Sequence, residues 1–169
     1  EHFNRYGEYD QAIEYFENSL VILRKTLEPE DPRFSVCYNG LGISFSGKRE
    51  HDRAIECHEK ALAILREKHG HNHRSLTFTL QKLGHCYIKK RSPLESNDVR
   101  PLTIDEKIKN YERGRIYFEQ SLQIDIKNLC FDHPNVAIRY FDLAKLYCAR
   151  SFLNPDLAIK YYKEGLEII

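Results

Sequence analysis

The fold is decided by an eleven-residue stretch, Ser35-Val-Cys-Tyr-Asn-Gly-Leu-Gly-Ile-Ser-Phe45, because its pattern returns twice further along the chain. The shared pattern is Leu, then Gly or Ala, then an aromatic residue three positions on. The other two copies are Thr77-Phe-Thr-Leu-Gln-Lys-Leu-Gly-His-Cys-Tyr87 and Ala137-Ile-Arg-Tyr-Phe-Asp-Leu-Ala-Lys-Leu-Tyr147. Copies of this kind indicate a protein built from stacked structural units.

A second pattern has a small residue, an aromatic residue or His four positions later, and a small residue seven positions later. It occurs at Ala12/Phe16/Ser19, Ala54/His58/Ala61, Gly114/Phe118/Ser121 and Ala158/Tyr162/Gly165. Leu41 and Leu83 are 42 residues apart, and the step from Leu83 to Leu143 is 60, one period plus an insertion of 18 residues. Small residues at helical spacing let two helices approach closely while bulkier neighbours fill the remaining space. The repeat unit is therefore predicted to be a helical hairpin.

Proline and capping residues predict where the helices begin. Asp31-Pro32, His133-Pro134 and Asn154-Pro155 place Pro at a first helical position, and Thr103-Ile-Asp-Glu106 is a capping box. We expect an all-α fold of about seven helices, arranged as three hairpins preceded by the second helix of another. The expected helices span residues 8–27, 32–47, 50–69, 74–90, 103–129, 133–149 and 155–169.

Composition argues against several functional classes. The 169 residues carry 26 Lys plus Arg and 25 Asp plus Glu, which lacks the basic surplus that nucleic-acid binding usually needs. No apolar run approaches the length of about eighteen residues that a membrane span requires, and the first residues do not resemble a signal peptide. The five Cys are odd in number and include no CxxC pair, which favours reduced thiols. We expect a soluble, cytoplasmic protein that binds neither nucleic acid nor membrane.

These motifs resemble the tetratricopeptide repeat family, whose units carry an L-G-x2-Y element and an A-x3-F element. The long period resembles the subtype found in kinesin light chains, which His133-Pro-Asn-Val-Ala137 followed by Leu143-Ala-Lys-Leu-Tyr147 matches. The resemblance implies a right-handed α-α superhelix, or solenoid. It also implies a single array over residues 1–169, which we expect to be a fragment continued by further repeats of a parent chain. Its parts are a truncated repeat at 8–31, a repeat at 32–73, a repeat at 74–132 with an insertion around 90–102, and a repeat at 133–169.

The resemblance further implies that the first helix of each hairpin lines a concave groove that holds a peptide or a partner helix. The family's groove positions are the second, fifth, ninth and twelfth residues of each unit. Here they are Val36, Asn39, Ile43, Ser46, Phe78, Gln81, His85, Ile88, Ile138, Phe141, Lys145 and Cys148. Apolar members would supply contact area, Asn39 and Gln81 would pair with main-chain amides, and specificity would come from His85 and Lys145. Any single position could instead pack between neighbouring hairpins, and the Lys, Asn and Arg pattern of a carboxylate clamp is missing.

Other chemistry is weakly supported. His69-Gly-His71-Asn-His73 could hold a divalent ion, but His73 fills the linker position of the repeat, and no metal or cofactor is expected. His85 and Cys86 are adjacent on a helix and point in different directions, so they form no nucleophile–base pair. The insertion after Lys89-Lys90-Arg91 is either a solvated loop or a partner-specific element. The helix that follows it is expected to overhang the stack and could form a second contact surface.

We therefore expect a protein–protein interaction scaffold that binds a protein or peptide ligand and is not an enzyme. One alternative is a regulatory or targeting segment of a larger enzyme whose catalytic domain lies outside this sequence. A second alternative is a structural spacer whose groove is filled by its own chain. RNA recognition is the weakest alternative, given the neutral charge and the 42-residue period.

Overall fold

A computed structural model describes residues 2–90, 102–149 and 154–169, with side chains from Gly7 onward. The described residues form seven α-helices and no β-strand, as the sequence predicts. The helices are α1 (His2–Thr26), α2 (Pro32–Gly47), α3 (His51–His69), α4 (Leu76–Lys89), α5 (Ile104–Asn128), α6 (Pro134–Tyr147) and α7 (Pro155–Leu166).

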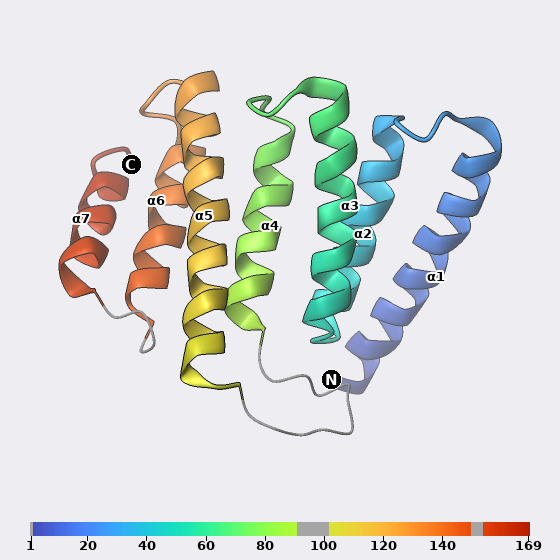
Figure 1. The fold of residues 1–169 in the computed structure, drawn as a ribbon, viewed down its shortest axis with the longest axis horizontal. Helices are drawn as coiled ribbons and strands as arrows, with labels where there is room; N and C mark the ends of the chain where they lie inside the picture. Colours follow the sequence, from blue (N-terminus) through green and yellow to red (C-terminus); the bar gives the residue numbers. More distant parts are fainter. Residues whose placement is uncertain (1, 91–101, 150–153) are drawn as a thin grey trace.

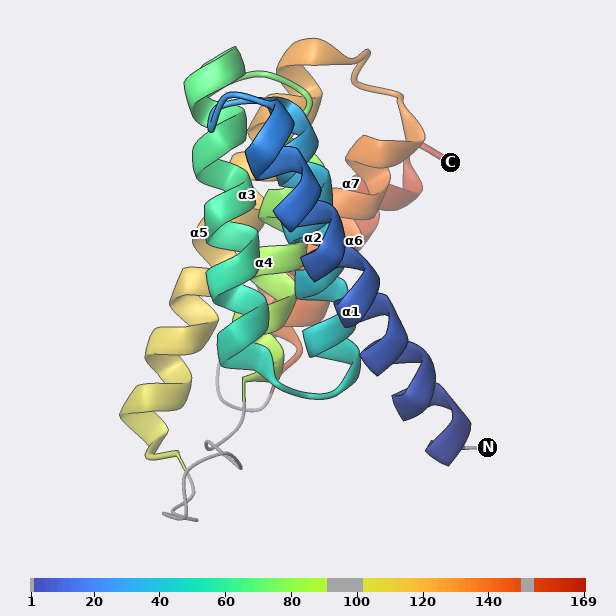
Figure 2. The same cartoon turned by 90° about the vertical axis from the view of Figure 1, so that its right-hand side faces the viewer.

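The helices are stacked as neighbouring hairpins in one row, from α1 at one end to α7 at the other (Figure 1). Within the hairpins α2 packs on α3, α4 on α5 and α6 on α7, and α1, α3 and α5 each contact the first helix of the next hairpin. Viewed along the row, α3 and α5 lie on one side of the molecule and α2, α4 and α6 lie beside them on the other (Figure 2). This arrangement is an α-solenoid, in which each unit buries its apolar surface against its neighbours.

The linker residues before α2, α4 and α6 perform the same local task. Each of them accepts a hydrogen bond on its side chain from the backbone N–H of the residue two positions later in the sequence. The distances are 2.9 Å for Asp31, 3.2 Å for His73 and 3.1 Å for His133. Asp31 and His133 are followed by Pro at the first helical position. His73 is followed by Arg74, and α4 begins only at Leu76, two residues later than predicted, because nothing fixes the backbone of its first turn.

The start of α1 differs most from the prediction, since the helix begins at His2 rather than at residue 8. Gly7 lies inside it, where a glycine costs only about 1 kcal/mol relative to Ala. Adding a residue to an existing helix gains one hydrogen bond, so the helix continues through Gly7.

Glycines mark the close contacts between paired helices, as the small-residue pattern predicts. A methyl group on Gly84 would lie 2.4 Å from Cε1 of Phe118, and one on Gly42 would lie 2.5 Å from Nε2 of His58. Real Cβ atoms essentially never lie this close to a neighbour, so a side chain at either position would force the Phe118 or His58 ring to move. The close approach of α2 to α3 and of α4 to α5 therefore depends on them.

The buried apolar residues form two clusters that meet at α5. The first is built mainly on α1 to α4 and includes Leu41 and Leu83, and Ile124 of α5 also belongs to it. The second is built on α5 to α7 and includes Phe118 and Leu143. Because α5 contributes to both clusters, it joins the two parts of the core. None of the helices in the described ranges combines the length and apolarity that crossing a bilayer requires.

Candidate functional site

The twelve predicted groove positions lie along α2, α4 and α6, and we call this set the first-helix face. Three of them, Val36, Phe78 and Ile138, are equivalent in the repeat and are exposed to 65%, 45% and 44%. A row of solvent-facing apolar side chains therefore crosses all three hairpins. Ile43, Lys145 and Cys148 on the same face are also exposed.

The other six members are half-buried, and several already have partners within the protein. Ile88 packs against the second core cluster. The Phe141 ring lies 6.1 Å from the Tyr162 ring and close to Gly165, so it contributes to packing between α6 and α7. Ser46 is also half-buried. These positions hold the hairpins together as well as lining the face.

The two amides of the first-helix face link neighbouring helices. Asn39 Nδ2 donates to Thr79 Oγ1 at 2.9 Å, while its oxygen lies 2.8 Å from His58 Nδ1. Gln81 Nε2 donates to Asp142 Oδ2 at 2.8 Å. An amide has two N–H groups and an oxygen with two lone pairs, so each retains some hydrogen-bonding capacity. The amides are thus fixed in orientation by α4 and α6.

His85 lies between Asp142 and the second core cluster. Its Nε2 is 3.5 Å from Asp142 Oδ1, and its ring meets the Phe118 ring edge-on at 5.1 Å. Burial lowers the pKa of His85, and the nearby Asp142 carboxylate partly opposes that effect. Around neutral pH the ring is neutral and can donate or accept one hydrogen bond on each nitrogen.

A buried ion pair behind this face is absent from the sequence prediction. Arg139 Nε donates to Asp125 Oδ2 at 3.0 Å, and its Nη1 lies 3.9 Å from Asp142 Oδ2. Arg139, Asp125 and Asp142 are all buried. In the preceding unit the equivalents of Arg139 and Asp125 are Thr79 and Leu65. Aligning the repeats at every position could therefore have revealed that two uncharged residues are replaced by a pair of opposite charge.

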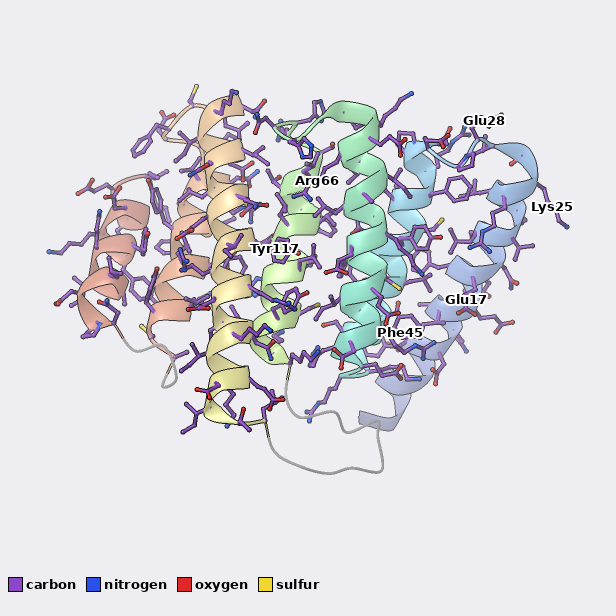
Figure 3. All side chains as sticks on the ribbon, in the orientation of Figure 1. Glu17, Lys25, Glu28, Phe45, Arg66 and Tyr117 are labelled. Atoms are coloured by element: carbon purple, nitrogen blue, oxygen red, sulfur yellow. The ribbon has the colours of Figure 1, made fainter. Side chains whose placement is uncertain are left out.

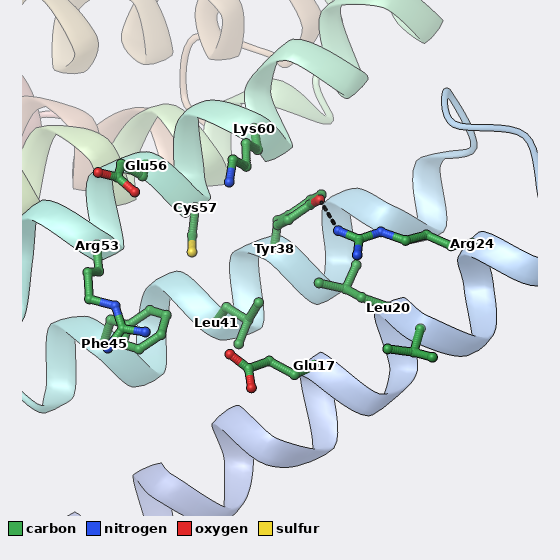
Figure 4. Close-up of a pocket in the computed structure, with 11 residues that line it drawn as sticks. Glu17, Leu20, Arg24, Tyr38, Leu41, Phe45, Arg53, Glu56, Cys57 and Lys60 are labelled. Carbon is green, nitrogen blue, oxygen red and sulfur yellow. Dashed lines mark hydrogen bonds between the residues drawn. The ribbon is translucent and has the colours of Figure 1, made fainter.

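A pocket of about 400 Å³ lies on the opposite side of α2, between α1 and α3 (Figure 4). Apolar side chains of α1 and α2 form much of its lining, while Arg24, Arg53 and Lys60 bring positive charge and Glu17 and Glu56 negative charge. The complete lining is Glu17, Leu20, Val21, Arg24, Tyr38, Leu41, Phe45, Arg53, Glu56, Cys57 and Lys60. The groove prediction did not include this pocket.

The positions considered for other chemistry have structural roles. The His69 and His73 rings stack at 4.5 Å, and His73 Nδ1 accepts from the Ser75 backbone. Within the described ranges no three His, Cys, Asp or Glu residues are grouped as a metal site would require. Cys86 is buried, and burial raises its pKa, which disfavours the thiolate that a nucleophile needs.

The insertion predicted around residues 90–102 lies largely outside the described residues. After it, α5 begins with the predicted capping box, in which Glu106 N donates to Thr103 Oγ1 at 3.2 Å. No residue of α5 before Gly114 is buried. Its first turns extend beyond the neighbouring helices (Figure 2), as the predicted overhang requires.

Two solved structures have the same fold as this chain. BtubC (BKLC) from P. vanneervenii has a similar structure, with a TM-score of 0.75 and 18% identity over 98% of this chain and 58% of that one. The second structure is a single-residue variant of the nearly identical TPR-like repeats of a Podosopora anserina protein assigned to the kinesin light chains. Its TM-score is 0.73 and its sequence identity is 20%, over 96% of this chain and 67% of that one. At these identities the likeness is one of fold: this chain is a helical-hairpin solenoid.

The first part of the sequence matches a known family. The model of the tetratricopeptide repeat family matches residues 1–67, and the later hairpins continue the same fold. Residues 1–67 therefore match the tetratricopeptide repeat family, and the structural neighbours of the chain are kinesin-light-chain-like repeats, as the 42-residue period predicts. It spans 58% of the length of BtubC. No curated protein matched its sequence.

Proposed function

We propose that this chain is a non-catalytic module that binds an extended peptide or an amphipathic helix along its first-helix face. The observation that carries the proposal is the exposed row of Val36, Phe78 and Ile138, one from each hairpin. Tetratricopeptide repeats are protein-interaction scaffolds, which supports a protein ligand. The five unpaired cysteines suit a reducing compartment, so the proposal places the module in the cytoplasm.

The face offers both contact area and polar recognition. Burying the exposed apolar row removes hydrocarbon from water, which is the main favourable term in association. Asn39 and Gln81 hold their amides in fixed orientations, because Thr79 and Asp142 already accept one hydrogen bond from each. A pre-oriented amide loses less conformational freedom on binding than a free one. Lys145, exposed at the far end of the row, favours a carboxylate in the ligand.

A displayed library of peptides tests this proposal. Peptides selected on the 169-residue protein should bind at least tenfold more weakly to the variant Val36→Asp, Phe78→Asp, Ile138→Asp, because charge replaces the apolar row. The matched control changes three exposed isoleucines outside the first-helix face, Ile116, Ile126 and Ile159, to Asp. Unchanged affinity in the first variant, with circular dichroism showing both variants folded, would refute the proposal.

A further inference from the structure

The pocket between α1 and α3 corresponds to a place that tyrosine fills in the other two hairpins. Tyr117 stacks on Tyr87 with ring centroids 5.7 Å apart and planes at 17°. Tyr161 stacks on Tyr147 with centroids again 5.7 Å apart and planes at 16°. In both hairpins a tyrosine from the second helix packs on an aromatic residue that ends the first-helix motif. The same aromatic pair thus closes the outer surface of two successive units.

In the first hairpin the second member of the pair is missing. Phe45 is the equivalent of Tyr87 and Tyr147, but the position of Tyr117 and Tyr161, immediately before the aromatic or His of the second pattern, holds Cys57. A thiol is far smaller than a phenol ring. Among the described residues no aromatic ring lies against Phe45, and both Phe45 and Cys57 line the pocket. The pocket exists where the tyrosine of the other units would be.

The first hairpin retains the cation that accompanies the aromatic pair of the second hairpin, whereas the third hairpin has Leu157 at that position. The Arg113 guanidinium lies 5.5 Å from the Tyr87 ring centroid, and its equivalent Arg53 lies 3.9 Å from that of Phe45. Figure 3 places Arg66 and Tyr117 in the space between α3 and α5, and Glu17 and Phe45 in the corresponding space between α1 and α3. The first hairpin thus keeps the cation and the first ring, lacks the second ring, and has its cation closer to the first ring than the second hairpin does.

The charges at the other end of the pocket also differ between units. Arg66 Nη2 donates to Gln120 Oε1 at 3.3 Å, whereas the equivalent residues Arg24 and Lys60 are both cations. Arg24 instead donates to the Tyr38 hydroxyl at 3.5 Å, and Lys60 Nζ lies 5.8 Å from the Tyr38 ring (Figure 4). Within the described ranges neither cation forms an ion pair with a carboxylate.

Phe45 is only 4% exposed, because the Arg53 guanidinium covers its ring. We propose that this pocket binds an aromatic side chain of a partner polypeptide in the place of the missing tyrosine, against the Arg53 guanidinium, with one adjacent carboxylate held by Arg24 and Lys60. Glu17 and Glu56 also line the pocket, so a run of several carboxylates is repelled and a single one is favoured. The site lies across α2 from the first-helix face, and the proposal does not depend on the function of that face.

Small probe molecules test the aromatic ring and the carboxylate of the proposed ligand separately. In a two-dimensional NMR titration of the 169-residue protein, N-acetyl-tyrosine, which has a free carboxylate, should shift amide signals of α1, α2 and α3. N-acetyl-tyrosinamide, which lacks the charge, should bind at least threefold more weakly, and N-acetyl-alanine should produce no saturable shift. Equal binding of the three probes, or shifts confined to α4 to α7, would overturn the proposal.

Variants of the pocket provide the matched test. Cys57→Tyr should restore the ring pair of the other units, abolish binding of N-acetyl-tyrosine and raise the melting temperature, whereas Cys57→Ser should keep binding. Arg24→Gln with Lys60→Gln should remove the preference for the acid over the amide, which tests the site even if Cys57→Tyr fails to fold. The variant with three Asp on the first-helix face should bind the probes normally. Undiminished probe binding by folded Cys57→Tyr would contradict the proposal.

Discussion

His58 is a buried titratable residue of the first hairpin. It occupies the place of Phe16, Phe118 and Tyr162 in the other units and is 1% exposed. Burial lowers its pKa from 6.5 to about 4, and its Nε2 has no hydrogen-bond partner among the described residues. Between these two pKa values the unfolded chain binds a proton at this residue that the folded protein does not. The contribution of neutral His58 to the free energy of unfolding is therefore fully present above pH 6.5, and it is lost as the pH falls towards 4.

The histidine contribution can be isolated by substitution. At pH 5 the proton taken up by unfolded His58 should cost the folded state about 2 kcal/mol relative to pH 7. His58→Phe, which has the ring of the equivalent Phe118, should remove that part of the loss. Urea unfolding of both proteins at pH 7 and pH 5 measures the difference. An identical pH dependence in the two proteins would show that His58 is not the titrating group.

Gly84 sets how closely α4 and α5 approach. Because a methyl group there would lie 2.4 Å from Phe118 Cε1, Gly84→Ala should destabilise the protein by about 1–3 kcal/mol, partly offset by the higher helix propensity of Ala. Gly7→Ala is the control, since a methyl group at Gly7 has no neighbour within 4 Å and should leave stability equal or slightly higher. Thermal unfolding of both variants tests this, and equal effects would exclude the packing explanation.

At the scale of elements, the junction of α5 and α6 depends on an ion pair where the preceding junction has Leu65 and Thr79. Removing one partner of a buried pair leaves an uncompensated charge, so Arg139→Thr alone should cost about 3–5 kcal/mol. The double variant Asp125→Leu, Arg139→Thr copies the preceding junction of α3 and α4. It should recover most of that loss, since apolar replacements of buried ion pairs are often neutral or stabilising.

A double-mutant cycle with Asp125→Leu, Arg139→Thr and both together measures the coupling between the two residues. Arg139→Thr also removes the 3.9 Å contact between Arg139 and Asp142, but this loss occurs with and without Asp125, so it cancels in the cycle. Purely additive losses in urea unfolding would show that the pair does not act as a unit.

The sequence predicts the elements better than the contacts between them. Helix positions follow from local features, such as Pro32 and the Thr103 capping box, and all seven helices are found within a few residues of expectation apart from the start of α1. Contacts between hairpins depend on which side chains meet, and no single repeat reveals that. The half-burial of Asn39 and Gln81 comes from partners 40 and 61 residues away. The pocket beside Cys57 is likewise visible only when the three units are compared.

At the scale of the whole molecule, a solenoid has no single core, and each unit is stabilised only by its neighbours. α5 contributes to both apolar clusters, whereas α1 has only Leu20 buried and α7 only Ala158 and Gly165 among the described side chains. Backbone amides exchange with solvent through local opening, which is easiest where few contacts must break. Amides of α4 and of α5 from Gly114 onward should therefore exchange most slowly, and those of α1 and α7 fastest.

Hydrogen exchange followed by mass spectrometry tests this gradient in the 169-residue protein, and Arg139→Thr sharpens the test. Because Arg139 joins α6 to α5, its loss should speed exchange throughout α6 and α7 while leaving α2 and α3 near their original rates. The direction follows from nearest-neighbour stabilisation, since breaking one junction frees only the units beyond it. A uniform increase along the chain would instead mean that the two clusters unfold as one cooperative unit, with α5 transmitting the loss from the second cluster to the first.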